Sequence, residues 1–247
     1  MVVCSSGPRP LDSAPALTRH PSQAVLVVLV EARLGLTDGA LAAIGGYIPR
    51  YNIAPTQDHF VVIAKYENRA AMRARWGLVP YWSIDTSRAS QAINAKSETV
   101  DSTRTFREAF QKRRCVVPAD GFYEWTGPRT ARQPLWIKQR DRQLLLFAGL
   151  YEQWKPTVGD TLTTFTILTC AANTTMAQVH NRMPVILSER DADDWMNPRE
   201  ANPLALKRML VPAPEDLLEM RPVSPLVNDV RNEGAELLAE PIQRSLF

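Results

Sequence analysis

The sequence predicts a single α+β domain with a mainly antiparallel, barrel-like sheet and peripheral helices. Three observations support this fold class. Apolar residues make up 45% of the 247 residues, which is enough to bury a sizeable core. From Tyr51 onward, short strand-like runs follow one another with proline and glycine turns between them. Helical segments lie between and after these runs without a regular strand–helix alternation, and no linker divides the chain.

The first part of the chain lacks strand patterns. Residues 1–22 are rich in proline, serine and arginine and show no hydrophobic period, so we expect a poorly ordered arm. Residues 23–45 are apolar with a helical character, and the pair Gly45-Gly46 ends them.

Local patterns predict the strands and two later helices. The strand runs read FVVIAKY, MRARWGLV, RCVVP, PLWIKQ, QLLLFAGLYEQW and TLTTFTILTCAA. The second run alternates, which places Met72, Ala74 and Trp76 on one face. Ser188 is expected to cap the segment SERDADDWM, whose acidic first turn favours a helix. We expect a second short helix over residues 199–210.

Charge and cysteine content restrict the functional classes only loosely. The formal charge is +3, from 29 basic and 26 acidic residues, so any basic face must come from the distribution of charge. Cys4, Cys115 and Cys170 lack the spacing of metal ligands. The last two lie in apolar runs and are expected to be reduced core residues, which indicates a reducing compartment. No apolar run approaches the about 20 residues of a membrane-spanning helix, so we expect a cytoplasmic protein. We also expect it to be a monomer.

Two segments combine aromatic rings with fixed turns. In residues 51–57, YNIAPTQ, Pro55 restrains the backbone, either in a structural turn or as part of a site. In the segment WGLVPYW, Trp76 is expected in the core. Trp82 lies at the start of a loop, where an exposed ring can stack on a nucleobase.

A basic stretch follows the segment INAKSET. It carries Arg104, Arg107, Lys112, Arg113 and Arg114, and nearby acidic residues offset only part of that charge. Such a run is either a solvated helix face or a track of contacts to nucleic-acid phosphates, and the sequence leaves both open.

Two further segments carry candidate catalytic side chains. VPADGFYEW places Glu124 between two aromatic residues at the edge of an apolar strand. A partly desolvated carboxylate suits general acid–base catalysis, and the alternative is a structural ion pair with an arginine. VHNRMPV places His180 beside a cation and before a proline-fixed turn. A lone histidine is more often structural, so a catalytic role requires Asn94 and Glu124 to lie beside it.

Taken together, these segments resemble one family. RYNIAPTQ, RWGLVPYW, INAKSET, RRCVVPADGFYEW, TCAA, VHNRMPVIL and VSPLVNDVRNEGAELL occur in the order and approximate spacing of SOS-response-associated peptidases, also called abasic-site-processing proteins. The resemblance covers about residues 47–240 as one domain of this family. It leaves residues 1–46 as a divergent N-terminal arm and helix.

The resemblance implies a pierced, barrel-like α+β fold with a basic groove for single-stranded DNA that contains abasic sites. In the family, autocatalytic removal of the first methionine exposes a cysteine, which links covalently to the ring-opened aldehyde of an abasic site. It thus implies an autoprocessing peptidase with crosslinking or lyase-type activity in the DNA damage response. The implied catalytic residues are Asn94, Glu124 and His180. The implied DNA contacts are Asn52, Pro55, Trp82, Lys96, Arg104 and Arg182, and no metal or other cofactor is implied.

The N-terminus departs from the family pattern. The family begins Met-Cys-Gly-Arg, whereas this sequence reads MVVCSS, so Cys4 carries an amide nitrogen and not the amine that a thiazolidine requires. A start at a GTG codon for Val3, followed by methionine removal, would expose that amine. Three functions remain open: a covalent crosslinker, a non-covalent single-stranded-DNA-binding module that has lost the catalytic cysteine, and a cysteine hydrolase that uses Cys115 and His180.

Overall fold

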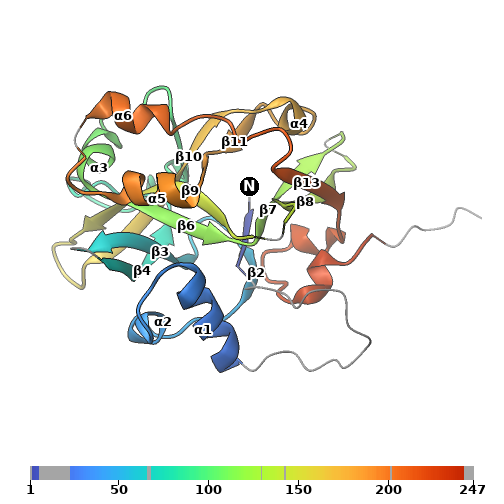
Figure 1. Ribbon diagram of the computed structural model, residues 1–247, viewed down its shortest axis with the longest axis horizontal. Coiled ribbons are helices and arrows are strands. Elements are labelled where there is room, and N and C mark those ends of the chain that lie inside the picture. The colour runs from blue at the N-terminus through green and yellow to red at the C-terminus, as the bar shows by residue number, and fades with distance from the viewer. Residues whose placement is uncertain are drawn as a thin grey trace, which may run out of the picture.

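The computed structural model describes residues 2–5, 23–65, 68–128, 130–141, 143–200 and 202–241. These residues form two sheets with helices around them (Figure 1). The five-stranded sheet contains, in spatial order, β13 (Leu218–Pro222), β8 (Gln133–Gln139), β7 (Gly121–Thr126), β1 (Val2–Ser5) and β2 (Arg50–Ile53). The eight-stranded sheet contains β11 (Arg182–Pro184), β10 (Leu162–Ala171), β4 (Asn68–Trp76), β3 (Asp58–Lys65), β6 (Arg114–Ala119), β9 (Leu145–Trp154) and β12 (Ile186–Leu187), with β5 (Asn94–Lys96) beside β10.

The helices are short and lie at the periphery. They are α1 (Gln23–Arg33), α2 (Ala40–Ala43), α3 (Arg107–Lys112), α4 (Thr174–Ala177), α5 (Glu189–Met196) and α6 (Pro203–Arg208), with 3-10 turns η1 (Ala89–Gln91), η2 (Pro225–Asn228) and η3 (Ala235–Leu238). Within the described ranges, none of the helices has the length and apolar character needed to cross a membrane.

The α+β single-domain class with a barrel-like sheet is confirmed, with one correction to strand direction. All pairings in the five-stranded sheet are antiparallel. In the eight-stranded sheet, however, β10 runs parallel to both β4 and β5, so this sheet is mixed. After the loop of residues 77–93, β5 continues the line of β4 along β10. Hydrophobic alternation reports which face of a strand is buried and carries no information on the direction of its neighbour.

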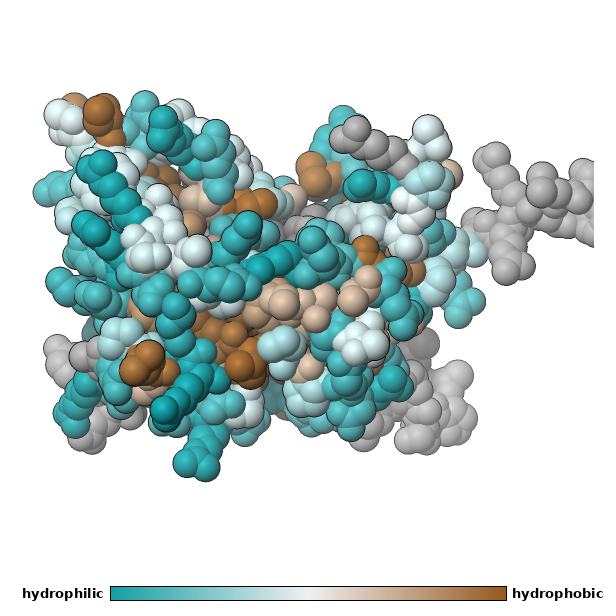
Figure 2. Space-filling view, turned by 90° about the horizontal axis from the view of Figure 1, so that it is seen from above, coloured by the Kyte–Doolittle hydropathy of each residue, from teal (hydrophilic) through white to brown (hydrophobic). Residues whose placement is uncertain are grey.

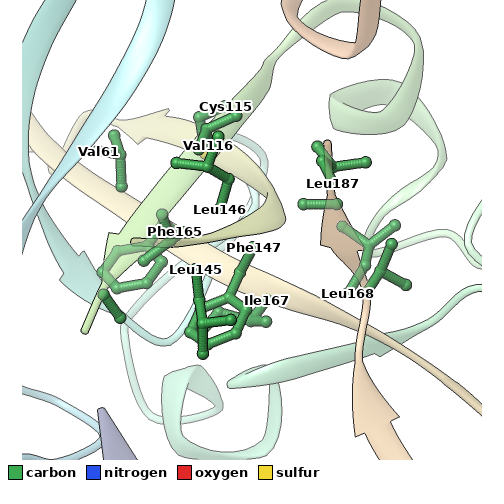
Figure 3. Packing of buried hydrophobic residues seen from close by; sticks show 14 of the residues in the cluster. Val61, Cys115, Val116, Leu145, Leu146, Phe147, Phe165, Ile167, Leu168 and Leu187 are labelled. Atoms are coloured by element: carbon green, nitrogen blue, oxygen red, sulfur yellow. The ribbon is translucent and has the colours of Figure 1, made fainter. Parts of the chain in front are cut away.

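The main core lies between the eight-stranded sheet and its covering elements. Val61, Val116, Phe147 and Phe165 come from four different strands of this sheet and are buried in one cluster (Figure 3). The predicted face of β4 is confirmed, because Ala74 and Trp76 are buried and Met72 packs against the same cluster. A second cluster forms around β7 and β8 from Tyr123, Trp136, Val223, Val227 and Leu238.

The N-terminal segment differs from the expected disordered arm. Residues 2–5 form β1, an interior strand of the five-stranded sheet between β7 and the edge strand β2. The rest of the expected arm, residues 6–22, lies outside the described residues. The helical character of residues 23–45 is confirmed, and Val30, Leu34 and Leu41 join the main core. Glu31 is buried because its carboxylate accepts hydrogen bonds from the backbone that begins α2.

The two helices expected near the C-terminus are present. The Ser188 side chain accepts a hydrogen bond of 3.1 Å from the Asp191 backbone at the start of α5, as predicted. The second helix, α6, is shorter than residues 199–210, because Asn202 caps it and Pro203 occupies its first turn. Proline at that position favours a helix start and disfavours a longer helix on its N-terminal side.

Arg114 corrects the interpretation of the basic stretch. It is 4% exposed, and its guanidinium donates to the backbone carbonyl oxygens of Phe110, Gln111, Trp195, Asn197 and Glu200. The side chain therefore joins the ends of α3 and α5 and is not available to nucleic acid. Five donors in a planar fork suit this role, and the linear sequence does not reveal it.

Replacing Arg114 with Met is expected to lower the free energy of unfolding by about 3 kcal/mol or more, because five carbonyl groups lose their donor. Denaturant titration followed by circular dichroism measures this loss. Lys112→Met is the matched control, since the Lys112 side chain is 65% exposed, and we expect a change within about 0.5 kcal/mol. A loss below about 1 kcal/mol in the Arg114 variant would show that Arg114 does not hold these helix ends together.

Candidate active site and nucleic-acid interface

Asn94 begins β5 and lies opposite Ile167 of β10. The preceding residue is fixed, because the Trp76 indole donates to the Ile93 carbonyl at 2.8 Å. The Asn94 Oδ1 atom is buried and has no hydrogen-bond partner among the described residues. A buried acceptor without a donor costs about 1–3 kcal/mol and is uncommon in native proteins. Asn94 thus offers an acceptor suited to a donor from a ligand or from another segment.

Glu124 lies on the half-buried part of β7. Successive strand residues point to opposite faces, so Glu124 shares a face with Phe122 and not with Tyr123. Phe122 belongs to the main core and packs against Phe147 of β9 with ring centroids 5.9 Å apart. Tyr123 packs in the second cluster on the other face. The Glu124 carboxylate therefore lies on the face turned toward the eight-stranded sheet.

His180 is exposed and lies between α4 and β11. Its Nδ1 atom accepts a hydrogen bond of 3.0 Å from the Arg182 backbone N–H. Nδ1 also lies 3.1 Å from the Arg182 carbonyl oxygen, a contact in which a protonated Nδ1 donates. Both contacts use Nδ1, so Nε2 is the ring nitrogen without a hydrogen bond to any residue in the described ranges, and in the imidazolium it is an N–H donor. Such a donor suits protonation of an oxygen atom, for example in the opening of a sugar ring.

The strand β10 brings two of the candidate segments together. Its residue Thr169 pairs with Lys96 of β5 on one edge and with Pro184 of β11 on the other. Arg182 of β11 then spans toward β5, where its guanidinium forms a bidentate pair with Glu98 at 2.7 and 2.9 Å. The segments of Asn94 and His180 thus meet around one strand. The convergence of Glu124 with them stays a prediction.

The surface above these strands is polar. In Figure 1 the N-terminal end of β1 lies between the labels of β11 and β7 and points toward the top of the view. Figure 2 looks at the molecule from that side, and hydrophilic side chains cover most of the face, with apolar atoms visible near its middle. A polar surface of this kind suits a charged polymer better than an apolar ligand.

Trp82 and Arg104, both predicted to contact DNA, lie together. The Arg104 guanidinium carbon is 4.3 Å from the centre of the Trp82 ring, in cation–π geometry. Both residues line an open cavity of about 690 Å³, which Arg88, Gln91 and Phe106 also line. Trp82 is 42% exposed, which agrees with the expectation that its ring is accessible. An aromatic ring beside two arginines suits a nucleobase and its phosphates.

The basic stretch divides into structural and exposed cations. Arg113 forms a 2.8 Å ion pair with the buried Glu152 carboxylate and also lies near Glu108. Burial raises the pKa of Glu152 above its usual range. Glu108 in turn hydrogen-bonds the Tyr81 hydroxyl, which raises the pKa of Tyr81. Arg113 therefore helps hold the loop that carries Trp82, whereas Arg104 remains exposed.

The segment RYNIAPTQ serves the fold as well as the candidate site. Asn52 is fully buried, and its amide nitrogen donates to the carbonyl oxygens of Val227, Asp229 and Asn232. Those three bonds leave no free amide donor for DNA, so we revise the role of Asn52 from contact to positioning. Pro55 is half-buried at the turn, where it remains a candidate contact.

Lys96 and Arg182 differ in how they are held. Lys96 is exposed on β5 and makes no side-chain hydrogen bond or ion pair with any residue in the described ranges. It is therefore free to contact a phosphate. Arg182 is instead held by Glu98 and by the Thr169 carbonyl, at 2.5 Å from that oxygen.

The cysteines occupy three different settings. The Cys4 backbone pairs with Gly121 of β7, three positions from Glu124. Cys115 is fully buried in β6, where desolvation raises the pKa of its thiol far above the usual range. Burial likewise raises the pKa of Cys170 to about 11. A thiolate nucleophile needs a lowered pKa and access, so a hydrolase that uses Cys115 is excluded.

Three residues near the site were not singled out from the sequence. Thr56 follows Pro55 in the turn and has a φ of 73°. Among the described residues it is the one non-glycine residue with a positive φ. Strained backbone of this kind is often found at functional sites. Glu98 holds Arg182, and the Glu215 carboxylate accepts from the backbone N–H groups that begin α4, the helix before His180. INAKSET did place Glu98 near the site, but nothing local signals the role of Glu215.

Comparison with known proteins identifies the class to which this fold and site belong. The sequence model of the SOS response associated peptidase (SRAP) family matches residues 22–230, which include α1 and α2. The chain belongs to this family.

Named relatives cover most of the chain. The abasic site processing protein YoqW of Bacillus subtilis (strain 168) is 40% identical over 196 residues, which cover 78% of this chain and 87% of YoqW. The abasic site processing protein HMCES of Gallus gallus is 32% identical over 231 residues, 81% of this chain and 68% of HMCES. A crystal structure of a Bacteroides thetaiotaomicron protein shares the fold, with a TM-score of 0.78 at 22% identity over 87% of this chain and 95% of that one.

Proposed function

We propose that this protein processes abasic sites in single-stranded DNA as part of the DNA damage response. The observation that carries the proposal is the buried Oδ1 of Asn94, on a strand that also presents the exposed cation Lys96. Neither group has a partner among the residues that the structure describes. The Asn94 oxygen can accept a hydrogen bond from the reacting group, and the Lys96 ammonium can bind a phosphate of the DNA. The names of relatives such as YoqW and HMCES support the same function.

The covalent form of this function uses Cys4 after hydrolysis of the Val3–Cys4 peptide bond. Water adds to that bond, the first three residues leave, and Cys4 gains a free amine. The amine attacks the aldehyde of the ring-opened abasic sugar and expels water to form an imine. The thiol then adds to the imine carbon and closes a five-membered thiazolidine, so that the aldehyde and the aminothiol combine with net loss of one water.

Each candidate residue has a role that matches its setting. Glu124 accepts and returns protons during hydrolysis of the peptide bond and formation of the imine. The Asn94 Oδ1 accepts a hydrogen bond from the Cys4 amine. The imidazolium of His180 donates its Nε2 proton to the sugar ring oxygen as the ring opens, which generates the aldehyde and leaves a neutral imidazole.

A second function uses the same surface without covalent chemistry. In the structure, Cys4 is an internal strand residue whose backbone pairs with Gly121. This observation favours a non-covalent single-stranded-DNA-binding module for the chain that retains residues 1–3. The two functions share the DNA contacts and differ only in whether the complex survives denaturation.

Arg104→Ala is expected to weaken binding of single-stranded DNA by about fivefold, because one cation that contacts phosphate or base is lost. Fluorescence anisotropy over a range of salt concentrations measures the effect, and the salt slope should fall by about 1. Intact and abasic oligonucleotides, and a duplex of the same sequence, test the substrate class in the same assay.

Arg140→Ala is the matched control for charge, since Arg140 lies on the exposed turn after β8 and outside the cavity of Trp82. Equal affinity of the Arg104 variant and wild type would remove Arg104 from the DNA-binding surface. Absence of any binding of wild type to single-stranded DNA would contradict the proposed function itself.

A further inference from the structure

The ion pair between Arg182 and Glu98 joins one fixed partner to one exposed partner. The Arg182 side chain is 22% exposed and also donates to the Thr169 carbonyl at 2.5 Å and to the Thr169 hydroxyl at 3.2 Å. The Glu98 side chain is 51% exposed. The hydrogen bonds from Arg182 lower the pKa of its carboxyl, and its other hydrogen bonds are local, to the Glu98 backbone and the Ser97 side chain. The arginine is therefore held by the sheet, and the carboxylate is the member that can move.

The backbone of Glu98 is anchored independently of its carboxylate. The Lys207 ammonium donates to the Glu98 carbonyl oxygen at 3.2 Å and to the Asp101 carboxylate at 2.9 Å. The loop after β5 is thus fixed from α6. Rotation of the Glu98 side chain away from Arg182 would leave these contacts intact.

The geometry of the pair is that of a phosphate contact. A carboxylate and a phosphodiester both present two oxygens to the planar guanidinium fork, and arginine binds either in the same bidentate manner. The exposed cation Lys96 lies two positions before Glu98 on the same segment. A strand of nucleic acid that contacts Lys96 would carry a phosphate close to the position that Glu98 now occupies.

We propose that Glu98 stands in for a phosphate of the bound strand in the DNA-free protein and yields the Arg182 guanidinium to that phosphate when single-stranded DNA binds. This inference rests on the proposed function, and it identifies Glu98 as the side chain that sets the affinity of the site for single-stranded DNA. Half-exposed ion pairs are weak, so the exchange is accessible at ordinary DNA concentrations. Glu98 also keeps Arg182 oriented while no DNA is bound, and it makes the free site less attractive to other anions.

Glu98→Gln is expected to bind single-stranded DNA roughly two- to fivefold more tightly than wild type, because Arg182 no longer has a competing carboxylate. Fluorescence anisotropy with a labelled oligonucleotide measures Kd, and thermal melting confirms that the variant is folded. Asp101→Asn is the matched control. It removes a nearby negative charge that pairs with Lys207 and not with Arg182, so any gain shared by both variants reflects net charge alone.

A double-mutant cycle separates exchange from general repulsion. In an Arg182→Gln background, Glu98→Gln should gain no more than Asp101→Asn does, because the guanidinium through which Glu98 acts is gone. If the single Glu98 variant binds DNA no more tightly than wild type does, the inference is overturned and Glu98 has a fixed positioning role. A gain that persists in the Arg182→Gln background would overturn it as well. Failure of wild type to bind any single-stranded DNA would contradict the proposed function instead.

Discussion

The chain that begins at Cys4 is expected to form a product with abasic single-stranded DNA that survives denaturation, whereas the chain that retains residues 1–3 is not. Only an N-terminal cysteine has an amine and a thiol on adjacent carbons, which thiazolidine formation requires. Incubation of each form with an abasic oligonucleotide, followed by a denaturing gel, measures the product as a shifted band. An oligonucleotide with an intact base is the substrate control, because it offers no aldehyde.

The strand register adds a condition to this prediction. Cys4 pairs with Gly121, so its backbone lies about 10 Å along the strand from Glu124, at about 3.3 Å per residue. For the Cys4 amine to approach Glu124, β1 must slide along β7. A slide of three residues would pair Cys4 with Glu124 itself, and a shift by an odd number of residues also exchanges the two faces of β1.

Two variants decide which atom is the nucleophile. In the shortened chain, Cys4→Ala and Cys4→Ser both keep the N-terminal amine but lack the thiol, so both should lose the thiazolidine band and give a shifted band only after the imine is reduced. A band from the chain with residues 1–3 that persists after Cys4→Ala would show that the nucleophile is another group. A shortened chain that binds abasic DNA but never crosslinks would favour the non-covalent module.

Glu124→Gln in the shortened chain is expected to slow crosslinking by about 100-fold or more, because the amide cannot take up or return a proton. The free energy of unfolding should change by only about 1 kcal/mol, since Gln has nearly the same shape. A single-turnover time course on denaturing gels measures the rate, and thermal melting measures the fold. His180→Ala should likewise slow the reaction while leaving the melting transition nearly intact.

Glu219→Gln is the matched control for Glu124. Glu219 lies on β13 of the same sheet and pairs with Lys138 at the surface, so its loss should leave the crosslinking rate unchanged. Collapse of the melting transition in the Glu124 variant would assign this carboxylate a structural role. A rate equal to that of wild type would remove Glu124 from the reaction.

Local pattern accounts for much of the fold and for part of the site. The alternation in MRARWGLV predicted the buried face of β4, and Ser188 predicted the start of α5, because both signals are complete within a few residues. The exposed ring of Trp82 was likewise expected from its loop. Its pairing with Arg104 joins segments more than twenty residues apart, and no local rule predicts that contact.

What the sequence by itself determined is the set of segments, the family to which they belong and the residue types available for chemistry. The tertiary structure alone decided which cations face solvent and which hold the protein together. Arg104 and Arg114 lie in the same basic stretch, yet one covers an exposed ring and the buried guanidinium of the other donates to five backbone carbonyls. The structure alone also placed Cys4 opposite Gly121 and Glu98 against Arg182. A side chain's role depends on burial and on partners distant in the sequence, and both are set only when the strands take their places around β10.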